Sequence, residues 1–254
     1  MIPEERKRKI ARIVKEREGA SVHELADELS VSESTIRRDL KKMDQEDLIQ
    51  RSHGGALPMK KLAGEASFDQ RSVQNLEEKK AIADRALNEI KEGQVVFFDS
   101  GTTVLEVAKR TPKDGSIISV TNSIELGFEL GKEEGNLKIT GGNQRNKSRS
   151  LVGPVTERFL SNHRFDLLLL GTNSIDLQAG LSTQNEQEAR VKQLMVDKSE
   201  RIVLLADGSK LEQRSYVKFA DLEEIDMLIT DTRLTDEQRD RFREWNVDII
   251  DGLL

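Results

Sequence analysis

The sequence contains no cysteine, only four prolines and few aromatic residues. The absence of cysteine excludes disulfide bonds, thiolate nucleophiles and cysteine-ligated metals. Aromatic side chains make up 4% of the 254 residues, which argues against stacking surfaces for single-stranded nucleic acid. No apolar run approaches the roughly 18 residues of a membrane span, and the N-terminus lacks the apolar stretch of a signal peptide. These features predict a cytoplasmic protein with no membrane partner.

The net charge of −6 is unevenly distributed along the chain. Residues 1–57 hold twelve basic and twelve acidic residues, whereas the remainder holds 28 and 34 and carries the whole excess. An overall negative charge argues against a protein that coats nucleic acid indiscriminately. A neutral head with clustered cations and an acidic body is compatible with a protein whose head alone reads DNA.

Residues 32–43, S-E-S-T-I-R-R-D-L-K-K-M, have the pattern of an amphipathic helix capped by Ser32. Three apolar residues recur at i, i+4 and i+7, namely Ile36, Leu40 and Met43. The other side carries hydroxyls and cations, namely Ser34, Arg37, Arg38, Lys41 and Lys42. On its own this helix is compatible with an ordinary solvated basic face or with a face that contacts DNA.

The flanking segments favour the DNA-contacting interpretation. Ser21 and Glu24 form a capping box ahead of a second amphipathic helix, so that two short helices are separated by a tight turn. After residue 43, a strand-like segment reaches Gly54-Gly55 and turns back, which predicts a two-stranded wing. In this wing, Arg51 and His53 are candidates to contact the sugar-phosphate backbone or a minor groove.

The strings S-V-S-E-S-T-I-R-R-D-L and R-S-H-G-G-A closely resemble the winged helix–turn–helix of the DeoR family of bacterial-type transcriptional regulators. The resemblance implies a double-stranded DNA operator as partner. The residues that it places at the operator are Ser34, Thr35, Arg37, Arg38 and Lys41, with Arg51 and His53 in the wing. Asp39 is expected to be structural instead, paired with a nearby cation such as Arg38 or Lys42, because a carboxylate beside phosphates is unfavourable.

Residues 58–75 combine Pro, Gly, Ser and mixed charge without clear periodicity, which predicts a linker between two domains. Within this linker, Phe68 and Arg71 are expected to dock against the second domain. The chain thereby divides into a DNA-binding domain over 1–57, the linker over 58–75 and a further domain over 76–254. That domain alternates helices with short apolar strands, which predicts a mostly parallel α/β sheet. The expected strands are 95–98, 117–120, 137–140, 166–170, 201–206, 227–230 and 247–250.

Polar loops follow at least five of these strands, and ligands bind at such strand ends in open α/β sheets. Residues 99–103, D-S-G-T-T, are the best phosphate candidate. Gly101 lets the backbone approach an anion, Ser100, Thr102 and Thr103 offer hydroxyls, and the following helix begins with free N–H groups. The alternative is an ordinary strand-to-helix turn with a threonine cap.

Other charged residues have simpler interpretations. Arg145, Lys147 and Arg149 are mostly expected to be solvated, and Glu188 and Lys192 have the i, i+4 spacing of a surface salt bridge. No nucleotide-binding loop, nucleophile elbow or metal-ligand cluster is present in the sequence, so neither a cofactor nor a metal is expected.

The strings S-G-T-T, V-T-N-S, T-G-G, S-L-V-G-P, G-L-S-T, D-G-S-K and L-I-T-D resemble the DeoR family sensor domain, whose fold is similar to that of ribose-phosphate isomerases and glucosamine-phosphate deaminases. The resemblance implies a phosphorylated sugar or related metabolite as effector. The candidate effector-binding residues are Lys79, Asp99, Ser100, Gly101, Thr102, Thr103, Asn122, Asp207 and Lys210.

Taken together, residues and resemblance predict a DNA-binding regulator rather than an enzyme, specifically a repressor of a sugar or polyol catabolic operon. Reading two half-sites requires a homo-oligomer, a dimer or a tetramer. The alternative is a sugar-phosphate isomerase or deaminase with an appended DNA-binding head, in which Asp99, Glu188 or Asp207 serves as the base.

Overall fold

The computed structural model describes residues 3–17, 19–29, 31–45, 49–52, 54–58 and 65–253. The chain divides into two compact units, Met1–Gly64 and Glu65–Leu254. The wing residue His53, the side chain of Arg51 and the linker residues 59–64 lie outside what is described. None of the helices in the described ranges has the length and apolarity needed to cross a membrane.

The first unit is a small helical domain with a three-stranded sheet of order β1-β3-β2. Its elements are α1 (Pro3–Glu16), β1 (Ala20–Ser21), α2 (Val22–Leu29), α3 (Glu33–Gln45), β2 (Ile49–Ser52) and β3 (Gly55–Pro58). Ile36, Leu40 and Met43 of α3 are buried in one core with α1 and α2, which confirms the predicted apolar stripe. The Ser21–Glu24 capping box is also present, with Glu24 N donating to Ser21 Oγ at 3.2 Å.

The wing depends on a close approach of two backbones. β2 and β3 form an antiparallel hairpin in which Ser52 faces Gly55, and Gly55 also faces Ser21 of β1. A Cβ atom at Gly55 would lie 2.1 Å from the carbonyl oxygen of Ala20, whereas one at Gly54 would meet nothing within 4 Å. Glycine is therefore required at position 55 by packing.

Asp39 is structural, as expected, but its partner is different. Arg6 on α1 donates from Nε to Asp39 Oδ2 at 2.5 Å, and Asp39 is buried. The expected partners were Arg38 and Lys42, which are both exposed on α3. Asp39 lies on the inner side of α3, so the cation that reaches it comes from another helix.

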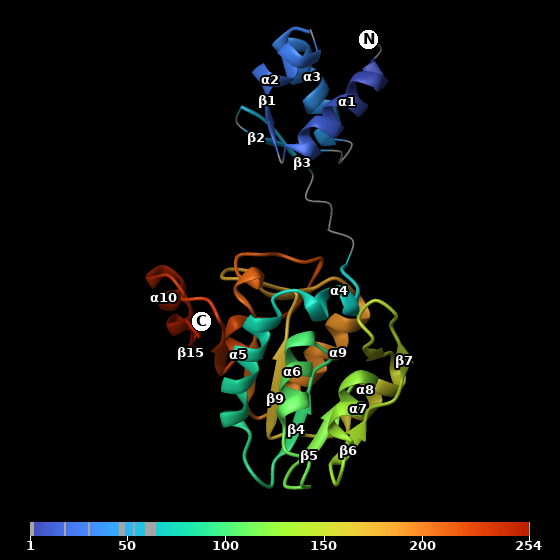
Figure 1. Cartoon of the computed structure of the whole chain (residues 1–254), viewed down its shortest axis with the longest axis vertical. Helices are drawn as coiled ribbons and strands as arrows, with labels where there is room; N and C mark the ends of the chain where they lie inside the picture. The colour runs from blue at the N-terminus through green and yellow to red at the C-terminus, as the bar shows by residue number, and fades with distance from the viewer. Residues whose placement is uncertain are drawn as a thin grey trace. The chain divides into compact units, whose positions relative to one another are not determined.

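The second unit is built on a seven-stranded, wholly parallel sheet of order β15-β14-β12-β9-β4-β5-β6 (Figure 1). Its strands are β4 (Val95–Phe98), β5 (Ile118–Thr121), β6 (Asn136–Ile139), β9 (Leu167–Gly171), β12 (Ile202–Leu205), β14 (Met227–Ile229) and β15 (Asp248–Ile250). All seven lie within one residue of their predicted bounds, which confirms the predicted α/β class.

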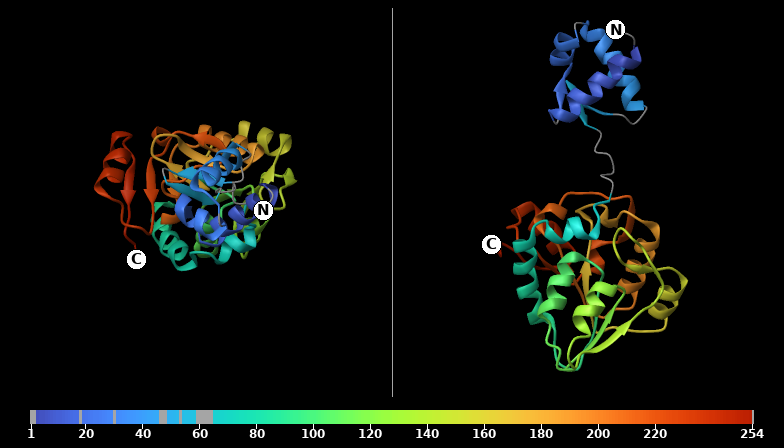
Figure 2. Two further views of the ribbon diagram at one scale, coloured as in Figure 1. Left: turned by 90° about the horizontal axis from the view of Figure 1, so that it is seen from above. Right: turned by 45° about the vertical axis from the view of Figure 1, so that its right-hand side comes forward.

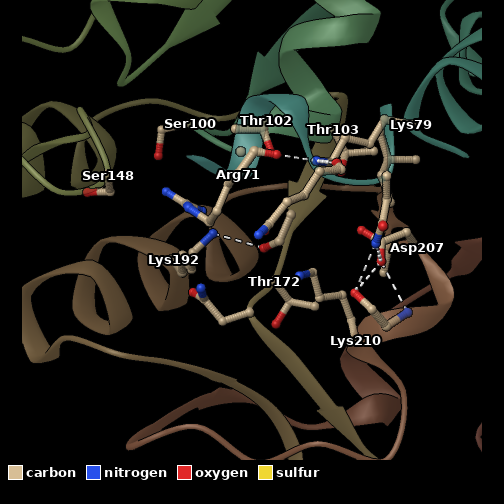
Figure 3. Close-up of a pocket in the computed structure, with 18 of the residues that line it drawn as sticks. Arg71, Lys79, Ser100, Thr102, Thr103, Ser148, Thr172, Lys192, Asp207 and Lys210 are labelled. Carbon is tan, nitrogen blue, oxygen red and sulfur yellow. Dashed lines mark hydrogen bonds between the residues drawn. The ribbon is translucent and has the colours of Figure 1, made fainter. Parts of the chain in front are cut away.

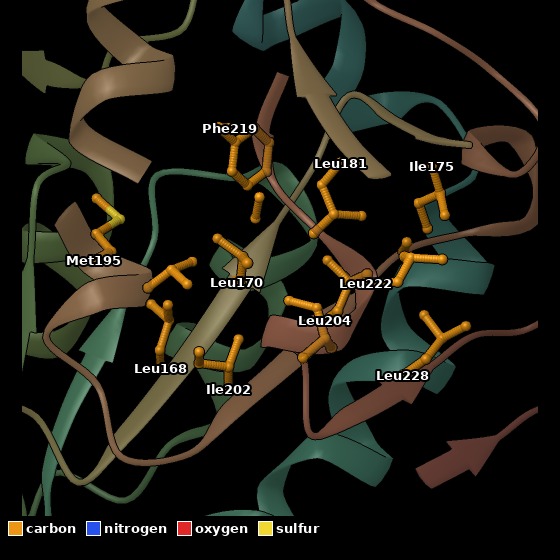
Figure 4. Packing of buried hydrophobic residues seen from close by; sticks show 14 of the residues in the cluster. Leu168, Leu170, Ile175, Leu181, Met195, Ile202, Leu204, Phe219, Leu222 and Leu228 are labelled. Atoms are coloured by element: carbon orange, nitrogen blue, oxygen red, sulfur yellow. The ribbon is translucent and has the colours of Figure 1, made fainter. Parts of the chain in front are cut away.

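Helices cover both faces of this sheet (Figures 1 and 2). The helices are α5 (Leu76–Ala86), α6 (Thr102–Arg110), α7 (Ile124–Leu130), α8 (Pro154–Ser161), α9 (Glu186–Asp197) and α10 (Asp236–Glu244), with 3-10 turns at Leu87–Glu89, Gly208–Lys210 and Leu222–Glu224. Alternate strand residues enter opposite cores because side chains alternate along a strand. Leu167 and Leu169 pack with α5 and α6, whereas Leu168 and Leu170 pack with α9 (Figure 4).

Several strands lie outside the predicted alternation. An antiparallel sheet of order β10-β11-β13 and a hairpin of β7 with β8 adjoin the main sheet. Their bounds are β7 (Asn143–Gln144), β8 (Leu151–Val152), β10 (Ser174–Asp176), β11 (Gly180–Thr183) and β13 (Val217–Ala220). None of them contains three consecutive apolar residues, so no apolar run identifies them in the sequence.

The predicted linker is partly folded, which corrects its extent. Residues 65–75, here called the strap, belong to the second unit and contain helix α4 (Phe68–Val73). Ser67 and Gln70 form a capping box that starts α4, and Phe68 is only 3% exposed within the core of α5 and α6. The expected docking of Phe68 is therefore confirmed, and the S-F-D-Q string was the sequence signal for the helix.

Candidate functional site

The exposed face of α3 carries the residues predicted to contact DNA. Ser34, Arg37, Arg38 and Lys41 are exposed, and Thr35 is half-buried. Arg37 donates to Glu33 at 3.0 Å one turn earlier. Ser32 Oγ lies 2.9 Å from the hydroxyl oxygens of Ser34 and Thr35, so these hydroxyls form a cluster at the start of the helix. The exposed side chains of α3 offer hydrogen-bond donors and acceptors for base edges, and an α-helix has the width that fits a major groove.

A cavity of about 330 Å³ lies in the second unit, at the carboxyl ends of β4, β9 and β12 (Figure 3). The sheet order reverses between β4 and β9, since β5 and β6 extend to one side and β12, β14 and β15 to the other. Loops at this point leave the sheet in opposite directions and open a crevice between them. The cavity is therefore where an open α/β sheet provides room for a ligand.

Seven of the nine predicted effector residues line this one cavity, namely Lys79, Ser100, Gly101, Thr102, Thr103, Asp207 and Lys210. The other two do not line it. Asp99 is fully buried, with its carboxylate accepting from Gly171 N at 2.9 Å and from Lys192. Asn122 is also buried and donates from Nδ2 to the carbonyl of Leu151 at 3.3 Å, which supports the loop next to β8. The Asp99 carboxylate is fully engaged inside the protein, whereas Asn122 Oδ1 is buried without a hydrogen-bond partner among the described residues.

The start of α6 forms one wall of the cavity. Gly101 is the N-cap of this helix, and no side chain in the described part of the chain caps the N–H groups of the first turn. The side chains of Thr102 and Thr103 follow directly and also line the cavity (Figure 3). Free N–H groups, the positive end of the helix dipole and two hydroxyls together favour an anion here.

Lys79 of α5 connects the cavity to the strap. Its ammonium group donates to the carbonyl oxygens of Arg71 and Gln74, at the C-terminal part of α4. Burial lowers the pKa of Lys79, and the nearby Asp207 carboxylate opposes that shift. Lys79 thus anchors the strap in addition to lining the cavity.

The loop after β12 provides a second connection to the strap. Asn75 Nδ2 donates to Asp207 Oδ1 at 3.0 Å, and Ser209 N donates to the same oxygen at 3.1 Å. Asn75 adopts a left-handed backbone with φ of 50°, a conformation that asparagine tolerates better than most residues. Asp207 therefore holds both the end of the strap and its own loop.

Glu188 and Lys192 do not form the surface salt bridge that their spacing suggested. Their exposures are only 6% and 8%, and each contacts a different part of the molecule. Glu188 accepts from Ser150 Oγ at 2.9 Å and from Thr183 Oγ1 at 3.3 Å. Lys192 donates to Asp99 and to the carbonyl of Gly171 at 2.9 Å. The spacing was correct, but the face of α9 that bears them points at the sheet ends.

Arg145 and Arg149 likewise are not solvated cations. Arg145 forms a two-pronged ion pair with Glu65 of the strap and lies 3.5 Å from Glu188. The hydrogen bond with Glu65 raises the pKa of Arg145. Arg149 Nη2 donates to Asp69 of α4 at 2.7 Å. Lys147 also reaches the strap, donating to the carbonyl of Glu65 at 3.2 Å. The run of cations after β7 therefore fastens the strap.

Arg71 of α4 is the cavity residue with the least satisfied side chain. Its Nε and Nη2 atoms are buried, and neither has a hydrogen-bond partner among the described residues. Burial lowers the pKa of Arg71, while Glu188, Glu65 and Asp99 oppose the shift. Docking of Arg71 on the second domain was expected, but its position in the cavity wall was not.

Among the described residues, no group of three or more His, Cys, Asp or Glu side chains is placed to hold a metal ion. The cavity lining instead combines four cationic side chains with two carboxylates, those of Glu188 and Asp207, and with hydroxyls and amides. The cations are Arg71, Lys79, Lys192 and Lys210. This composition suits a polyhydroxylated anion, whose charge the cations balance and whose hydroxyls the amides and hydroxyls bind.

Comparisons with known proteins match both units. The DeoR-like helix-turn-helix domain matches residues 6–61, and the DeoR C terminal sensor domain matches residues 74–232. The "HTH-type transcriptional regulator GlpR" of Haloferax volcanii is 51% identical over 253 residues, covering 100% of this chain and 99% of that protein. The "Putative aga operon transcriptional repressor" of Escherichia coli O157:H7 is 34% identical over 249 residues, covering 97% and 93%.

Among solved structures, ribose 5-phosphate isomerase A from Methanocaldococcus jannaschii matches with a TM-score of 0.41 and 15% identity. The match covers 54% of this chain and 55% of that chain. The assignment of the chain therefore rests on the two domain matches and on the full-length relatives.

Proposed function

Because the chain belongs to the DeoR family of transcriptional regulators, we propose that it represses a sugar or polyol catabolic operon under the control of a phosphorylated sugar. The chain is a DNA-binding regulator, and the operon class and effector are the proposed part. It acts in the cytoplasm on a double-stranded operator. The helix–turn–helix match favours this function over a sugar-phosphate isomerase or deaminase.

The cavity at the switch point of the sheet is the observation that carries the effector assignment. The uncapped start of α6 and the hydroxyls of Thr102 and Thr103 supply donors for phosphate oxygens. Asp207 and Asn173 line the same cavity and supply acceptors for sugar hydroxyls. A phosphorylated sugar matches both sets of groups, whereas an uncharged sugar offers no oxyanion to the start of α6 or to the guanidinium of Arg71.

On the DNA side, the proposal assigns base and phosphate contacts to Ser34, Thr35, Arg37, Arg38 and Lys41 of α3, with Arg51 and His53 in the wing. A homo-oligomer, at least a dimer, presents two copies of α3 to successive major grooves. The effector changes operator affinity only as far as it binds two arrangements of that oligomer unequally.

The test is operator binding in the presence of candidate effectors. DNA selected in vitro by the full-length protein is titrated by fluorescence anisotropy, with and without a panel of sugar phosphates and the matching unphosphorylated sugars. We expect a sugar phosphate to lower the affinity and its unphosphorylated form to have no effect.

A Thr102→Ala, Thr103→Ala double variant is expected to bind DNA normally and to lose the effector response. Ser161→Ala, at the exposed end of α8, is the matched control and is expected to respond normally. A double variant that retains the full response would remove α6 from the effector site.

A further inference from the structure

We propose that Arg71 completes the anion site of the cavity and thereby couples ligand binding to the strap, the segment through which the chain enters the second unit. This inference rests on the proposed function, since it takes the cavity as the effector site. It adds a named residue and a physical connection between ligand and linker.

The first argument is the unsatisfied guanidinium of Arg71. Nε and Nη2 form one side of the guanidinium fork, and both are buried without a partner among the described residues. Buried N–H groups of a charged side chain are costly when they lack acceptors. An oxyanion presents two oxygens at the spacing of this fork, so it satisfies both atoms at once.

The second argument is the position of Arg71 in the cavity. Its side chain points into the space between Thr102 of α6 and Lys192 of α9 (Figure 3). Lys192 already donates to Asp99 and to the carbonyl of Gly171. Lys79 donates to two carbonyls of the strap. Lys210 is less buried than either of these lysines, and among the described residues Arg71 is the cavity cation with buried donors that lack a protein acceptor.

The third argument is that Arg71 lies between the points at which the strap is fastened. Its N-terminal part is held by the buried Phe68 and by the cations after β7, which contact Glu65 and Asp69, and its C-terminal end is held by Lys79 and Asp207. Between these points, the side chain of Arg71 contributes no hydrogen bond from its buried Nε and Nη2 atoms. An anion held by both Arg71 and the start of α6 joins α4 to α6.

The consequence follows from linkage. A ligand that binds the docked strap more tightly than a loosened one stabilises the docked strap by the same factor. Because Glu65 is the first residue of the second unit, a change in the strap acts at the point where the chain leaves for the DNA-binding unit. Ligand and linker are coupled through one side chain.

The experiment measures backbone amide hydrogen exchange in the full-length protein with glucose 6-phosphate and with inorganic phosphate as probes. In the wild type we expect slower exchange at the start of α6 and across α4. In Arg71→Lys, which keeps the charge but loses the fork, we expect roughly tenfold weaker phosphate binding by calorimetry. At saturating probe, this variant should show protection of α6 without protection of α4.

Asp69→Asn is the matched control, because it alters α4 at an exposed ion pair with Arg149 outside the cavity lining. It is expected to retain protection of both helices, which separates a role of Arg71 from a general disturbance of α4. Protection of α6 without α4 in the wild type would overturn the coupling while leaving the cavity as an anion site. No protection in either helix would overturn both the coupling and the proposed effector site.

Discussion

Lys192 on α9 donates to the carboxylate of Asp99, 93 residues earlier at the end of β4. The same ammonium group donates to the carbonyl of Gly171, at the end of β9. One buried cation therefore joins the two strands between which the sheet order reverses. Asp99 also accepts from Gly171 N at 2.9 Å, so its carboxylate and Lys192 together hold the ends of β4 and β9 side by side next to the cavity.

Replacing Lys192 with Met is expected to destabilise the second unit, since it leaves the Asp99 carboxylate buried without a counter-charge. Loss of one partner from a buried ion pair costs about 3 kcal/mol. Urea unfolding, followed by the fluorescence of Trp245, the single tryptophan of the chain, measures the change. Adding Asp99→Asn is expected to recover part of the loss. Lys218→Met, at an exposed pair with Asp221, serves as the control with little effect.

The next prediction concerns Gly55 of the wing, for which the neighbouring Gly54 serves as the control. Gly55→Ala places a Cβ atom against the carbonyl of Ala20, and the backbones of β1 and β3 must separate to accept it. We expect a loss of about 2 kcal/mol from the first unit alone, together with weaker DNA binding. Gly54→Ala meets no atom within 4 Å and should leave both properties nearly unchanged.

Calorimetry distinguishes the units in this experiment, because each has its own hydrophobic core. The transition of the second unit, reported by Trp245, should not move in Gly55→Ala. Equal effects of the two glycine variants would contradict the close-approach explanation.

If the exposed face of α3 contacts the operator, removal of one of its cations should weaken DNA binding. Arg38→Ala is expected to weaken binding to the selected operator by roughly tenfold to a hundredfold, and more at low salt than at high salt. Arg243→Ala, at an exposed ion pair on α10 of the second unit, removes the same charge and should leave the affinity unchanged. Similar losses in both variants would indicate a general charge effect instead of a contact by α3.

The lowered pKa of Asp176 in β10 leads us to expect that the free energy of unfolding depends on pH. The hydrogen bond from Arg214, with Nε 2.5 Å from Asp176 Oδ2, lowers the pKa of Asp176 from 3.8 to about 2. Because the folded-state pKa is depressed, the stabilisation is complete above about pH 4 and is lost as the pH falls through about 2. The effect is modest, since Arg214 is exposed and salt screens the pair.

The measurement compares the free energies of unfolding of the wild type and Asp176→Asn from pH 6 downward. The two values should differ most at pH 6 and converge as Asp176 of the wild type becomes protonated. A constant difference across that range would show that ionisation of Asp176 does not contribute.

Local patterns were sufficient to predict the helix α3 and the seven strands of the main sheet, but not α4 or the short antiparallel strands. The apolar spacing of Ile36, Leu40 and Met43 predicted the buried side of α3, and seven apolar runs predicted the seven parallel strands. Seven of the nine proposed effector residues line one cavity; six of them follow β4 or β12, whose carboxyl ends the parallel sheet brings to the same edge, and Lys79 comes from α5. These inferences succeed because a period of 3.6 or 2 residues directly encodes which side chains share a face.

The tertiary structure alone decided which charged groups meet. Asp39 pairs with Arg6 instead of a neighbour on its own helix, and Lys192 pairs with Asp99 instead of Glu188. Arg71 entered the cavity wall because Phe68 anchors the strap on a core formed by α5 and α6. Spacing along the chain indicates that a charge can be buried, but a buried charge takes its partner from whatever segment the fold places beside it. The sequence by itself therefore determined the main sheet and the amphipathic helix α3, and packing over long separations decided how the cavity is connected to the strap.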